Sequence, residues 1–288
     1  MDYTAKKNKI ILKSPKSFNI KEILECGQVF RFFKLEENNY KIIAFGKALN
    51  VKQNTDVEFF PCTSEEFENI WIDYFDLERD YCSIKEELSK DDPVMEKAVN
   101  SAPGIRLLRQ EPYECLISFI ISQNNRIPMI QKVIENLSKK FGEPISAGEF
   151  YTFPKVERLN QASLDDIISC KTGFRAKYIK DACQKIVLKE IDIDNLKNLS
   201  ESDAGALLKS IYGVGQKVAD CVLLMALGKY AAFPTDVWVR RIMEELYFDK
   251  KQATVQRIHG FAREKWGDSA GFAQQYLFNY ARENKIGK

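Results

Sequence analysis

The chain has 288 residues, a formal net charge of +2 and 45% hydrophobic residues. This length allows one large domain or two of ordinary size, and the composition is that of a soluble globular protein. The seven cysteines are dispersed and no signal-like or membrane-length segment occurs, so we expect a cytoplasmic protein with reduced thiols. A single histidine, His259, excludes a His-rich metal cluster and leaves lysine, carboxylate or backbone groups for any chemistry.

The first part of the chain predicts an antiparallel sheet, because short aromatic and β-branched runs alternate with polar turns. The predicted strands cover residues 30–35, 40–45, 48–51 and 57–60. Thr63-Ser-Glu-Glu66 is a capping box, and apolar residues follow it at helical spacing. We therefore expect a helix that packs on this sheet.

From about Asp91 onward the apolar residues recur with helical periodicity, as in the stripe Ile130, Val133, Ile134, Leu137 and Phe141. Further helices are predicted over residues 157–169, 176–188, 203–227 (two helices), 237–246, 255–266 and 270–281. We predict an α+β protein. An N-terminal antiparallel sheet domain (1–92) is expected to pack on a mainly helical domain (93–288), whose last helix packs back on the first domain.

A glycine-rich hairpin interrupts the helical segment 203–227. Its residues Gly213-Val-Gly215 allow a tight turn between two helices, which is the pattern of a helix-hairpin-helix. The backbone N–H groups at the start of the second helix, near Gln216, are then available to bind a phosphate. An ordinary corner between two helices has the same pattern, so the hairpin alone does not establish a function.

Lys217 lies in the first turn of that second helix, beside apolar Val218 and near Cys221. The helix dipole disfavours a cation there by roughly 0.3–1 kcal/mol. A neutral amine is what a Schiff-base nucleophile needs, so the position indicates a reactive lysine. A solvated lysine in an unfavourable position remains an equal alternative on this observation alone.

Asp236 follows Phe233-Pro-Thr and precedes a predicted helix, which makes it a natural N-cap. Capping is a common structural role and is sufficient to explain the residue. A carboxylate at a pocket edge also stabilises the positive charge that develops when an N-glycosidic bond breaks. Lys217 and Asp236 are nineteen residues apart and each begins a helix beside the hairpin, which favours a joint catalytic role.

These residues resemble the helix-hairpin-helix DNA glycosylase superfamily, and within it the 8-oxoguanine DNA glycosylases. Matching blocks occur in the family's order from about residue 20 to 281: Cys26-Gly-Gln-Val-Phe-Arg31, Ser122-Gln-Asn-Asn125, Gly173-Phe-Arg-Ala-Lys-Tyr178, Gly213-Val-Gly-Gln-Lys-Val-Ala-Asp-Cys221, Pro234-Thr-Asp-Val237 and Trp266-Gly-Asp-Ser-Ala-Gly-Phe-Ala-Gln274. The resemblance implies a TBP-like sheet domain packed on a helical catalytic domain. It also implies a bifunctional glycosylase/AP lyase that excises 8-oxoguanine from duplex DNA.

The resemblance assigns catalytic roles to Lys217, as the nucleophile that attacks C1′ and forms a Schiff base for β-elimination, and to Asp236, as the carboxylate that assists it. Gly27 matches the glycine whose carbonyl accepts a hydrogen bond from N7–H, a proton that guanine lacks. An unmet buried acceptor costs about 1–3 kcal/mol, so one carbonyl can favour the lesion.

The other implied base-binding residues are Cys221, Met225, Gln274 and Phe278. Phe278 and Cys221 match the two faces that sandwich the extruded base, and Gln274 matches the side chain that binds its Watson–Crick edge. On the residues alone, core packing explains Phe278 and a plain turn explains Gly27.

The implied DNA contacts lie on two loops, the hairpin and one helix start: Gln123, Asn124, Asn125, Arg175, Gly213, Gly215, Gln216 and Trp238. Gln123 stands where the family's wedge asparagine fills the gap left by base flipping, and Arg175 matches an arginine that contacts the orphaned base. The family's second arginine, which recognises cytosine, is replaced by Pro128, and a phosphate-contacting histidine is replaced by Trp238. These departures put the preference for cytosine and one phosphate contact in doubt.

The backbone carbonyls of Lys209, Ile211 and Val214 are predicted to hold a monovalent cation at the hairpin. No organic cofactor is expected, and no iron–sulfur cluster, since no cysteine follows Cys221. The expected partner is double-stranded DNA with oxidised guanine, bound by a monomer through the hairpin and basic residues such as Arg126, Lys177, Arg240 and Arg241. The alternatives are a monofunctional alkyl-purine glycosylase of the same fold, a non-enzymatic DNA-binding module, or an unrelated scaffold.

Overall fold

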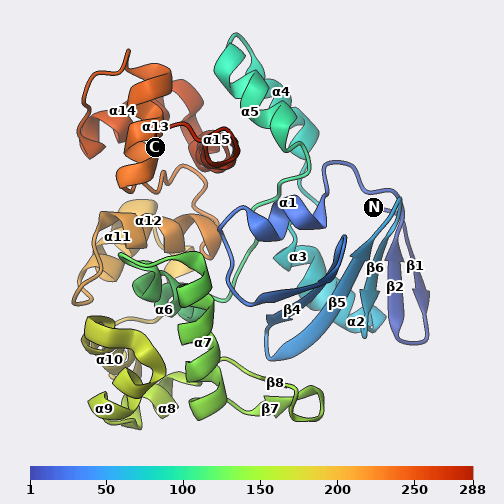
Figure 1. Ribbon diagram of the computed structural model, residues 1–288, viewed down its shortest axis with the longest axis vertical. Coiled ribbons are helices and arrows are strands. Elements are labelled where there is room, and N and C mark those ends of the chain that lie inside the picture. The colour runs from blue at the N-terminus through green and yellow to red at the C-terminus, as the bar shows by residue number, and fades with distance from the viewer. Residues whose placement is uncertain (288) are drawn as a thin grey trace.

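The computed structural model describes residues 1–287 and has the predicted α+β architecture, with a six-stranded antiparallel sheet followed by a mainly helical part (Figure 1). The strand order is β1-β2-β6-β5-β4-β3. The strands are β1 (Tyr3–Lys6), β2 (Lys9–Leu12), β3 (Phe32–Glu36), β4 (Asn39–Ala44), β5 (Lys47–Gln53) and β6 (Val57–Phe60). The predicted strand 30–35 begins two residues later than expected, and the hairpin β1–β2 was not predicted.

One face of the sheet is covered by short helical segments. They are α1 (Ile20–Glu25), and the run of α2 (Ser64–Glu66), a π-helical turn (Phe67–Trp71) and α3 (Ile72–Tyr74). The capping box is present as predicted, because Thr63 accepts from the Glu66 N–H at 3.2 Å and Glu66 accepts from the Thr63 N–H at 3.0 Å. Phe67 then packs on Phe59 of β6, with ring centroids 5.2 Å apart, which fixes the helical run against the sheet.

The rest of the chain is helical apart from one short hairpin. Its elements are α4 (Tyr81–Ser89), α5 (Pro93–Ser101), α6 (Pro112–Ser122), α7 (Ile127–Phe141), β7 (Pro144–Ile145), β8 (Phe150–Tyr151), α8 (Val156–Gln161), α9 (Leu164–Ile167), α10 (Ala176–Val187), α11 (Glu201–Lys209), α12 (Gln216–Met225), α13 (Val237–Tyr247), α14 (Val255–Trp266) and α15 (Ala270–Glu283). The predicted helix 157–169 is interrupted, because Ala162 is extended and Ser163 caps a new helix by accepting from the Asp166 N–H.

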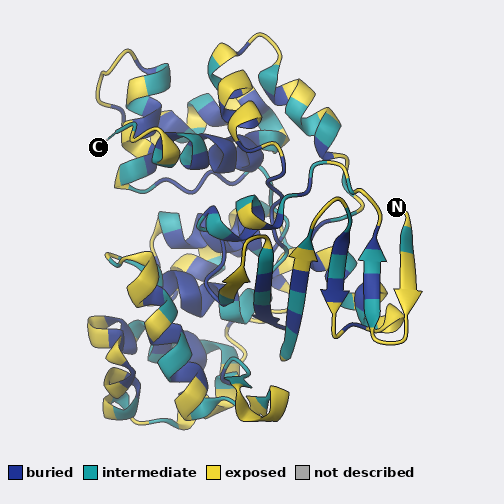
Figure 2. Ribbon diagram, turned by 45° about the vertical axis from the view of Figure 1, so that its right-hand side comes forward, coloured by how far each residue is buried: buried dark blue, intermediate teal, exposed yellow. Residues whose placement is uncertain are grey.

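Two apolar cores divide the molecule. The sheet core includes Phe59 and Phe75, whereas Tyr81, Leu88 and Met95 already belong to the helical core. Helix α4 packs on α5, and α5 packs on α15, so α4 packs with the helical part although it precedes residue 92. The domain boundary at residue 92 stays a prediction. Figure 2 shows the buried residues on the inward faces of the sheet and helices. Within residues 1–287, no helix has both the length and the apolar character needed to cross a bilayer.

Candidate active site

The hairpin between α11 and α12 has the geometry of an exposed backbone site. Gly213 has φ +80°, and a Cβ atom there would lie 2.4 Å from the ring of Tyr178, so only glycine fits. Gly215 is the N-cap of α12 with φ −95°, and a Cβ atom built on it would meet nothing within 4 Å. The start of α12 is therefore open toward solvent, where its unpaired N–H groups can meet a phosphate.

Lys217 is the second residue of α12 and is half-buried. Its Nζ lies 3.4 Å from the Ser122 hydroxyl at the end of α6, and 5.1 Å from the ring centroid of Phe119. The amine therefore points from the start of one helix across to another. It lies against an aromatic face, in a place where the N-terminal end of α12 disfavours a cation.

Asp236 is the N-cap of α13, as its sequence position predicts. Its Oδ1 accepts a hydrogen bond from the Val239 N–H at 2.8 Å. A carboxylate can accept further bonds at its second oxygen, so capping leaves Asp236 able to face a positive centre. The residue is half-buried, at the edge of the same pocket that Lys217 lines.

A cavity of about 60 Å³ collects all the predicted catalytic and base-binding residues. It is lined by Cys26, Gly27, Phe119, Lys217, Cys221, Met225, Pro234, Asp236, Val239, Gln274, Gln275 and Phe278. The walls come from the turn after α1 and from helices α6, α12, α13 and α15. Such a volume holds only a few water molecules, so a purine enters only after the lining side chains move apart.

Gln274 places an unpaired hydrogen-bond acceptor in this cavity. Its side chain is 5% exposed, and its Oε1 is buried without a hydrogen-bond partner among residues 1–287. Buried polar atoms are nearly always paired, because an unmet acceptor costs about 1–3 kcal/mol. An acceptor left open in the pocket is what a base with N–H donors would satisfy.

The turn that carries Gly27 is held rigidly. Gly27 has φ +89°, and a Cβ atom there would lie 3.3 Å from Phe278 Cε1, so this turn needs glycine. The adjoining Gln28 is fully buried and donates to the carbonyls of Ile23 and Arg106, both at 2.8 Å, while its Oε1 accepts from the Leu108 N–H at 2.9 Å. The Gly27 backbone is thereby positioned against the ring of Phe278.

Cys221 and Met225 form the apolar floor of the cavity, 2% and 4% exposed. Burial raises the pKa of the Cys221 thiol to about 11. The thiol therefore stays protonated at neutral pH and offers a soft surface for stacking, not a nucleophile.

The loop after α6 has its polar side chains turned back on the protein. Gln123 Nε2 donates to the Ile120 carbonyl at 3.3 Å, and Asn125 Nδ2 donates to the Ile121 carbonyl at 3.2 Å. Asn124, exposed between them, has φ +49°. Arg175 is 8% exposed and donates to the carbonyls of Gln123 (2.8 Å) and Asn124 (3.0 Å). The guanidinium group holds the loop in place through these hydrogen bonds. Its contact with an orphaned base remains a prediction.

Gln216, at the first position of α12, bridges two charged side chains. Its Oε1 accepts from Lys209 Nζ at 2.9 Å, and its Nε2 donates to Asp220 Oδ1 at 2.7 Å. The Ile211 carbonyl already accepts the Val214 N–H at 3.0 Å, but a carbonyl has a second lone pair for a cation. The monovalent cation site at the carbonyls of Lys209, Ile211 and Val214 stays a prediction.

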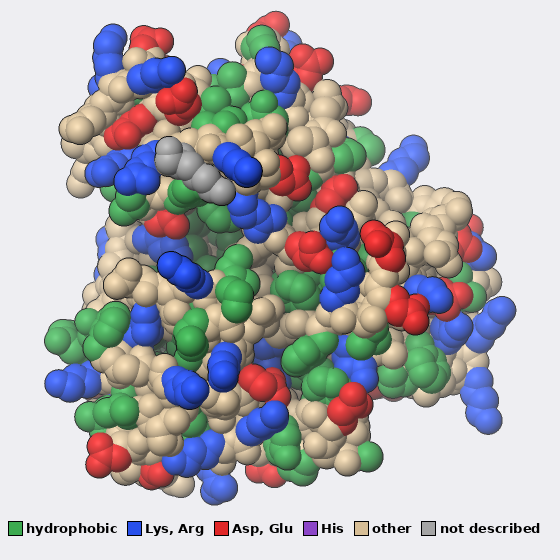
Figure 3. Space-filling view, viewed as in Figure 1, with side chains coloured by type: hydrophobic (Ala, Val, Ile, Leu, Met, Phe, Trp, Pro, Cys, Tyr) green, Lys and Arg blue, Asp and Glu red, His purple; other side chains and the backbone are tan. Residues whose placement is uncertain are grey.

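The remaining predicted DNA contacts lie on the surface of the helical part. Trp238, in the first turn of α13, is half-buried and packs on the helical core. The basic residues proposed to meet phosphates are all exposed: Arg126, Lys177, Arg240 and Arg241. Lys and Arg side chains are spread over the helical part of the face in Figure 3, where the molecule is hollowed.

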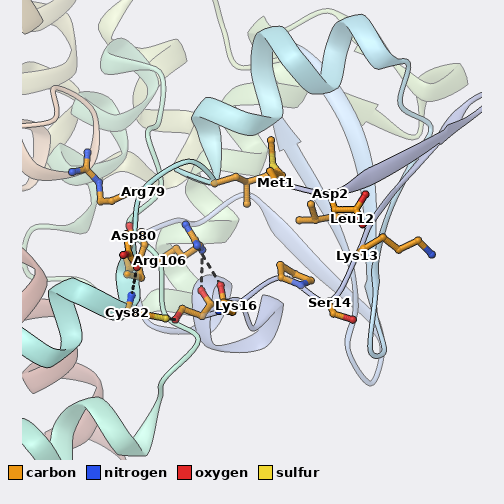
Figure 4. A pocket seen from close by; sticks show the side chains of 14 residues that line it. Met1, Asp2, Leu12, Lys13, Ser14, Lys16, Arg79, Asp80, Cys82 and Arg106 are labelled. Atoms are coloured by element: carbon orange, nitrogen blue, oxygen red, sulfur yellow. Dashed lines mark hydrogen bonds between the residues drawn. The ribbon is translucent and has the colours of Figure 1, made fainter.

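A larger cavity of about 350 Å³ lies between the N-terminal strands and the start of α4 (Figure 4). Its buried cation, Arg106, donates to the carbonyls of Ser17 at 2.8 Å and Lys16 at 3.3 Å, and also to that of Asp76. Asp80 accepts from the N–H groups that begin α4. These polar groups are committed to the fold, so the smaller cavity is the candidate active site.

Several residues of the site were not found by sequence reasoning. Gln275 Nε2 donates to the Cys26 carbonyl at 3.0 Å, and Phe119 supplies the ring beneath Lys217. His259 contacts both Thr235, the residue before Asp236, and Asp220, one turn after Lys217. Helical periodicity marks each of these residues only as core or surface, because their partners come from distant parts of the chain.

A helix-hairpin-helix whose second helix begins with a pocket-lining lysine, beside a capping aspartate, defines a base excision DNA repair protein. Residues 117–267 match the model of the HhH-GPD superfamily of base excision DNA repair proteins, and residues 10–116 match the 8-oxoguanine DNA glycosylase N-terminal domain. The chain belongs to the 8-oxoguanine DNA glycosylase family of this superfamily, whose members are N-glycosylase/DNA lyases. The family resemblance and the enzyme class inferred from the sequence are confirmed.

Three similar proteins illustrate the range of this likeness. A probable N-glycosylase/DNA lyase of Methanothermobacter thermautotrophicus is 34% identical over 244 residues, 77% of this chain and 76% of that protein. The Clostridium acetobutylicum 8-oxoguanine glycosylase/lyase, solved with double-stranded DNA containing cytosine opposite 8-oxoguanine, is 45% identical with a TM-score of 0.95 over 99% of both chains. The Archaeoglobus fulgidus 3-methyladenine DNA glycosylase shares the fold, at 23% identity and a TM-score of 0.77 over 96% of this chain and 98% of that one.

Proposed function

We propose that this enzyme excises 8-oxoguanine from duplex DNA and then cleaves the strand on the 3′ side of the abasic site, using Lys217 as its nucleophile. The observation that carries the proposal is the shared cavity: the Lys217 amine, the Asp236 carboxylate and the unpaired Gln274 acceptor line one small pocket beside the hairpin. One chain supplies all of these groups, so we expect the enzyme to act as a monomer.

In the first step the Lys217 amine attacks C1′ of the flipped nucleotide. The bond between C1′ and N9 breaks, and the base leaves with the bonding electrons and takes up a proton. Positive charge develops on the sugar as this bond lengthens, and Asp236, oriented by the Val239 N–H, stabilises that charge. Lys217 lines the pocket, so its amine is placed to attack C1′ once the nucleotide enters.

In the second step the sugar ring opens and the lysine nitrogen becomes a protonated Schiff base on C1′. Loss of a proton from C2′ then expels the 3′ phosphate by β-elimination, which breaks the bond between C3′ and its oxygen. Water finally hydrolyses the Schiff base and frees the Lys217 amine. Every step uses groups of this chain, the DNA and water.

Selection of the damaged base is proposed to rest on two walls of the pocket. The Gly27 carbonyl accepts the N7–H of 8-oxoguanine, and guanine lacks this proton. The buried Gln274 Oε1 accepts from the Watson–Crick edge, where a purine carries N–H donors. Phe278 and Cys221 are proposed to stack on the two faces of the base.

A strand-nicking assay tests the proposal. Wild-type enzyme is incubated with duplexes that carry 8-oxoguanine, an alkylated adenine or undamaged guanine at one position. We expect cleavage of the 8-oxoguanine duplex alone, its loss in Lys217→Gln, and wild-type activity in Lys139→Gln. Lys139 is a matched control because it is an exposed helical lysine, 60% exposed on α7. Release of the alkylated base without nicking would instead indicate a monofunctional glycosylase.

A further inference from the structure

A buried carboxylate lies behind the proposed nucleophile. Asp220 is on α12, one turn after Lys217, and is 4% exposed. Gln216 Nε2 donates to its Oδ1 at 2.7 Å, whereas its Oδ2 has no hydrogen-bond partner among residues 1–287. His259 Nε2 on α14 lies 3.7 Å from that oxygen.

The same histidine nitrogen contacts the loop that carries Asp236. His259 Nε2 lies 3.2 Å from the hydroxyl of Thr235, the residue before Asp236. The Thr235 hydroxyl also lies 2.9 Å from the Phe233 carbonyl, which can only accept, so its single proton is committed there. The hydroxyl oxygen must then accept from His259, and Nε2 carries the proton in the neutral ring.

The Nε2–H group therefore donates to the Thr235 hydroxyl of the loop, and the unpaired Asp220 oxygen of α12 lies 3.7 Å from the same nitrogen, in electrostatic contact but beyond hydrogen-bond distance. The imidazole of the chain's single histidine stands between the segments that carry Asp236 and Lys217. The proposed catalytic roles of Lys217 and Asp236 do not require this histidine contact.

We propose that Asp220 and His259 are positioning residues, which tie the Thr235–Asp236 segment to α12 and so fix how Asp236 approaches Lys217. The inference rests on the proposed function of those two residues. A misplacement of reacting groups by about 1 Å costs up to roughly a hundredfold in rate, so a contact that never touches the substrate can control the step.

The charges around this pair make the tie sensitive to pH. Burial raises the pKa of Asp220 to about 7, an effect that Glu201 increases and that the Gln216 amide and Lys209 oppose. Burial lowers the pKa of His259, opposed by the Phe233 carbonyl. The carboxyl group therefore takes up a proton before the imidazole does, and a protonated Asp220 loses the negative charge that attracts the Nε2–H group. The tie is complete above the pKa of Asp220 and weakens below it.

The test uses Asp220→Asn and His259→Ala in the full-length enzyme, with single-turnover excision and DNA affinity measured across neutral pH. We expect each variant to lose about tenfold in excision rate near pH 8 and to keep the Kd for DNA within about twofold. The rate ratio of wild type to Asp220→Asn should rise with pH, with a midpoint near the pKa of about 7. NMR of the wild-type histidine should show the Nε2–H tautomer and a response at that same midpoint.

Asp92→Asn is the matched control. Asp92 is also a buried aspartate tied to α14, since it is 5% exposed and lies 3.1 Å from Lys265 Nζ, but it is outside the pocket. The Asp92→Asn variant should leave the shape of the pH–rate profile unchanged. The inference is overturned if Asp220→Asn keeps the wild-type rate and profile, or if the histidine signals show the other tautomer and no response near pH 7. Failure of wild-type enzyme to nick the 8-oxoguanine duplex would overturn the proposed function instead.

Discussion

Gln275 and Cys26 are 249 residues apart in the chain, and the Gln275 amide donates to the Cys26 carbonyl at 3.0 Å. This bond joins α15 to the turn that presents Gly27 to the pocket. Gln275 is 2% exposed and Cys26 is fully buried, so neither group can turn to water if the bond is lost.

Replacement of Gln275 by Leu should therefore cost about 1–3 kcal/mol of unfolding free energy, because it leaves a buried carbonyl without a partner. Urea unfolding measures this cost. Excision of 8-oxoguanine should fall as well, since the Gly27 turn is released. An unchanged urea midpoint together with unchanged excision would show that the bond holds nothing in place.

Replacement of the neighbouring Gln274 by Leu should have opposite effects on stability and function. The unpaired Oε1 is removed, so the free protein should gain up to about 1–3 kcal/mol of stability. The variant should lose most of its affinity for a duplex with 8-oxoguanine, because the base edge loses its acceptor. Urea unfolding and fluorescence anisotropy with lesion and undamaged duplexes measure the two effects, and a loss of stability would contradict the assignment.

The base opposite the lesion should be recognised weakly. Pro128 is exposed near the start of α7, where the family resemblance expects an arginine that recognises cytosine. Wild-type enzyme should excise 8-oxoguanine opposite each of the four bases at rates within about tenfold. Pro128→Arg should raise the preference for cytosine by roughly 1–3 kcal/mol in kcat/KM. A strong cytosine preference in the wild type would show that other residues bind that base.

Asp220→Asn should stabilise the enzyme in alkaline solution. The pKa of Asp220 is raised from 3.8 to about 7 in the folded protein, so the unfolded chain ionises first as pH rises. Wild-type stability is therefore lost progressively between about pH 4 and pH 7, and the asparagine variant lacks this loss. The free energy of unfolding of the variant minus that of wild type, measured with urea, should be about 1–3 kcal/mol larger at pH 8 than at pH 5. A gain that is the same at both pH values would contradict the buried carboxylate's role.

The sequence predicted the elements that bury a regular stripe and missed those that do not. Helix α14 matches its predicted bounds, because its buried residues recur at helical spacing. Strand β1 was missed because its burial pattern is almost entirely exposed, so its residues show no alternation of apolar and polar side chains. Strand β2 alternates in burial over only four residues, and its sequence Lys9-Ile-Ile-Leu12 hides this because three consecutive residues are apolar.

For the site, the sequence identified residues whose local position is unusual for their charge. Lys217 and Asp236 begin helices, and each position has an electrostatic consequence that can be stated without a structure. Thr235, Asp220 and His259 have no such local mark, because they acquire a role only where α12, α14 and the intervening loop pack together. Arg175 was singled out by the family resemblance as a contact to the orphaned base. Its bonds to the Gln123 and Asn124 carbonyls could not be predicted from the sequence, because they follow from tertiary packing.

In the proposed mechanism the Lys217 nitrogen forms a covalent bond to the deoxyribose. Borohydride reduction of enzyme incubated with an 8-oxoguanine duplex, followed by proteolysis and mass spectrometry, tests this bond most directly. We expect a reduced sugar remnant on the peptide that contains Lys217, and no adduct in Lys217→Gln. An adduct on another amine of the wild-type enzyme, or strand cleavage by Lys217→Gln at the wild-type rate, would contradict it.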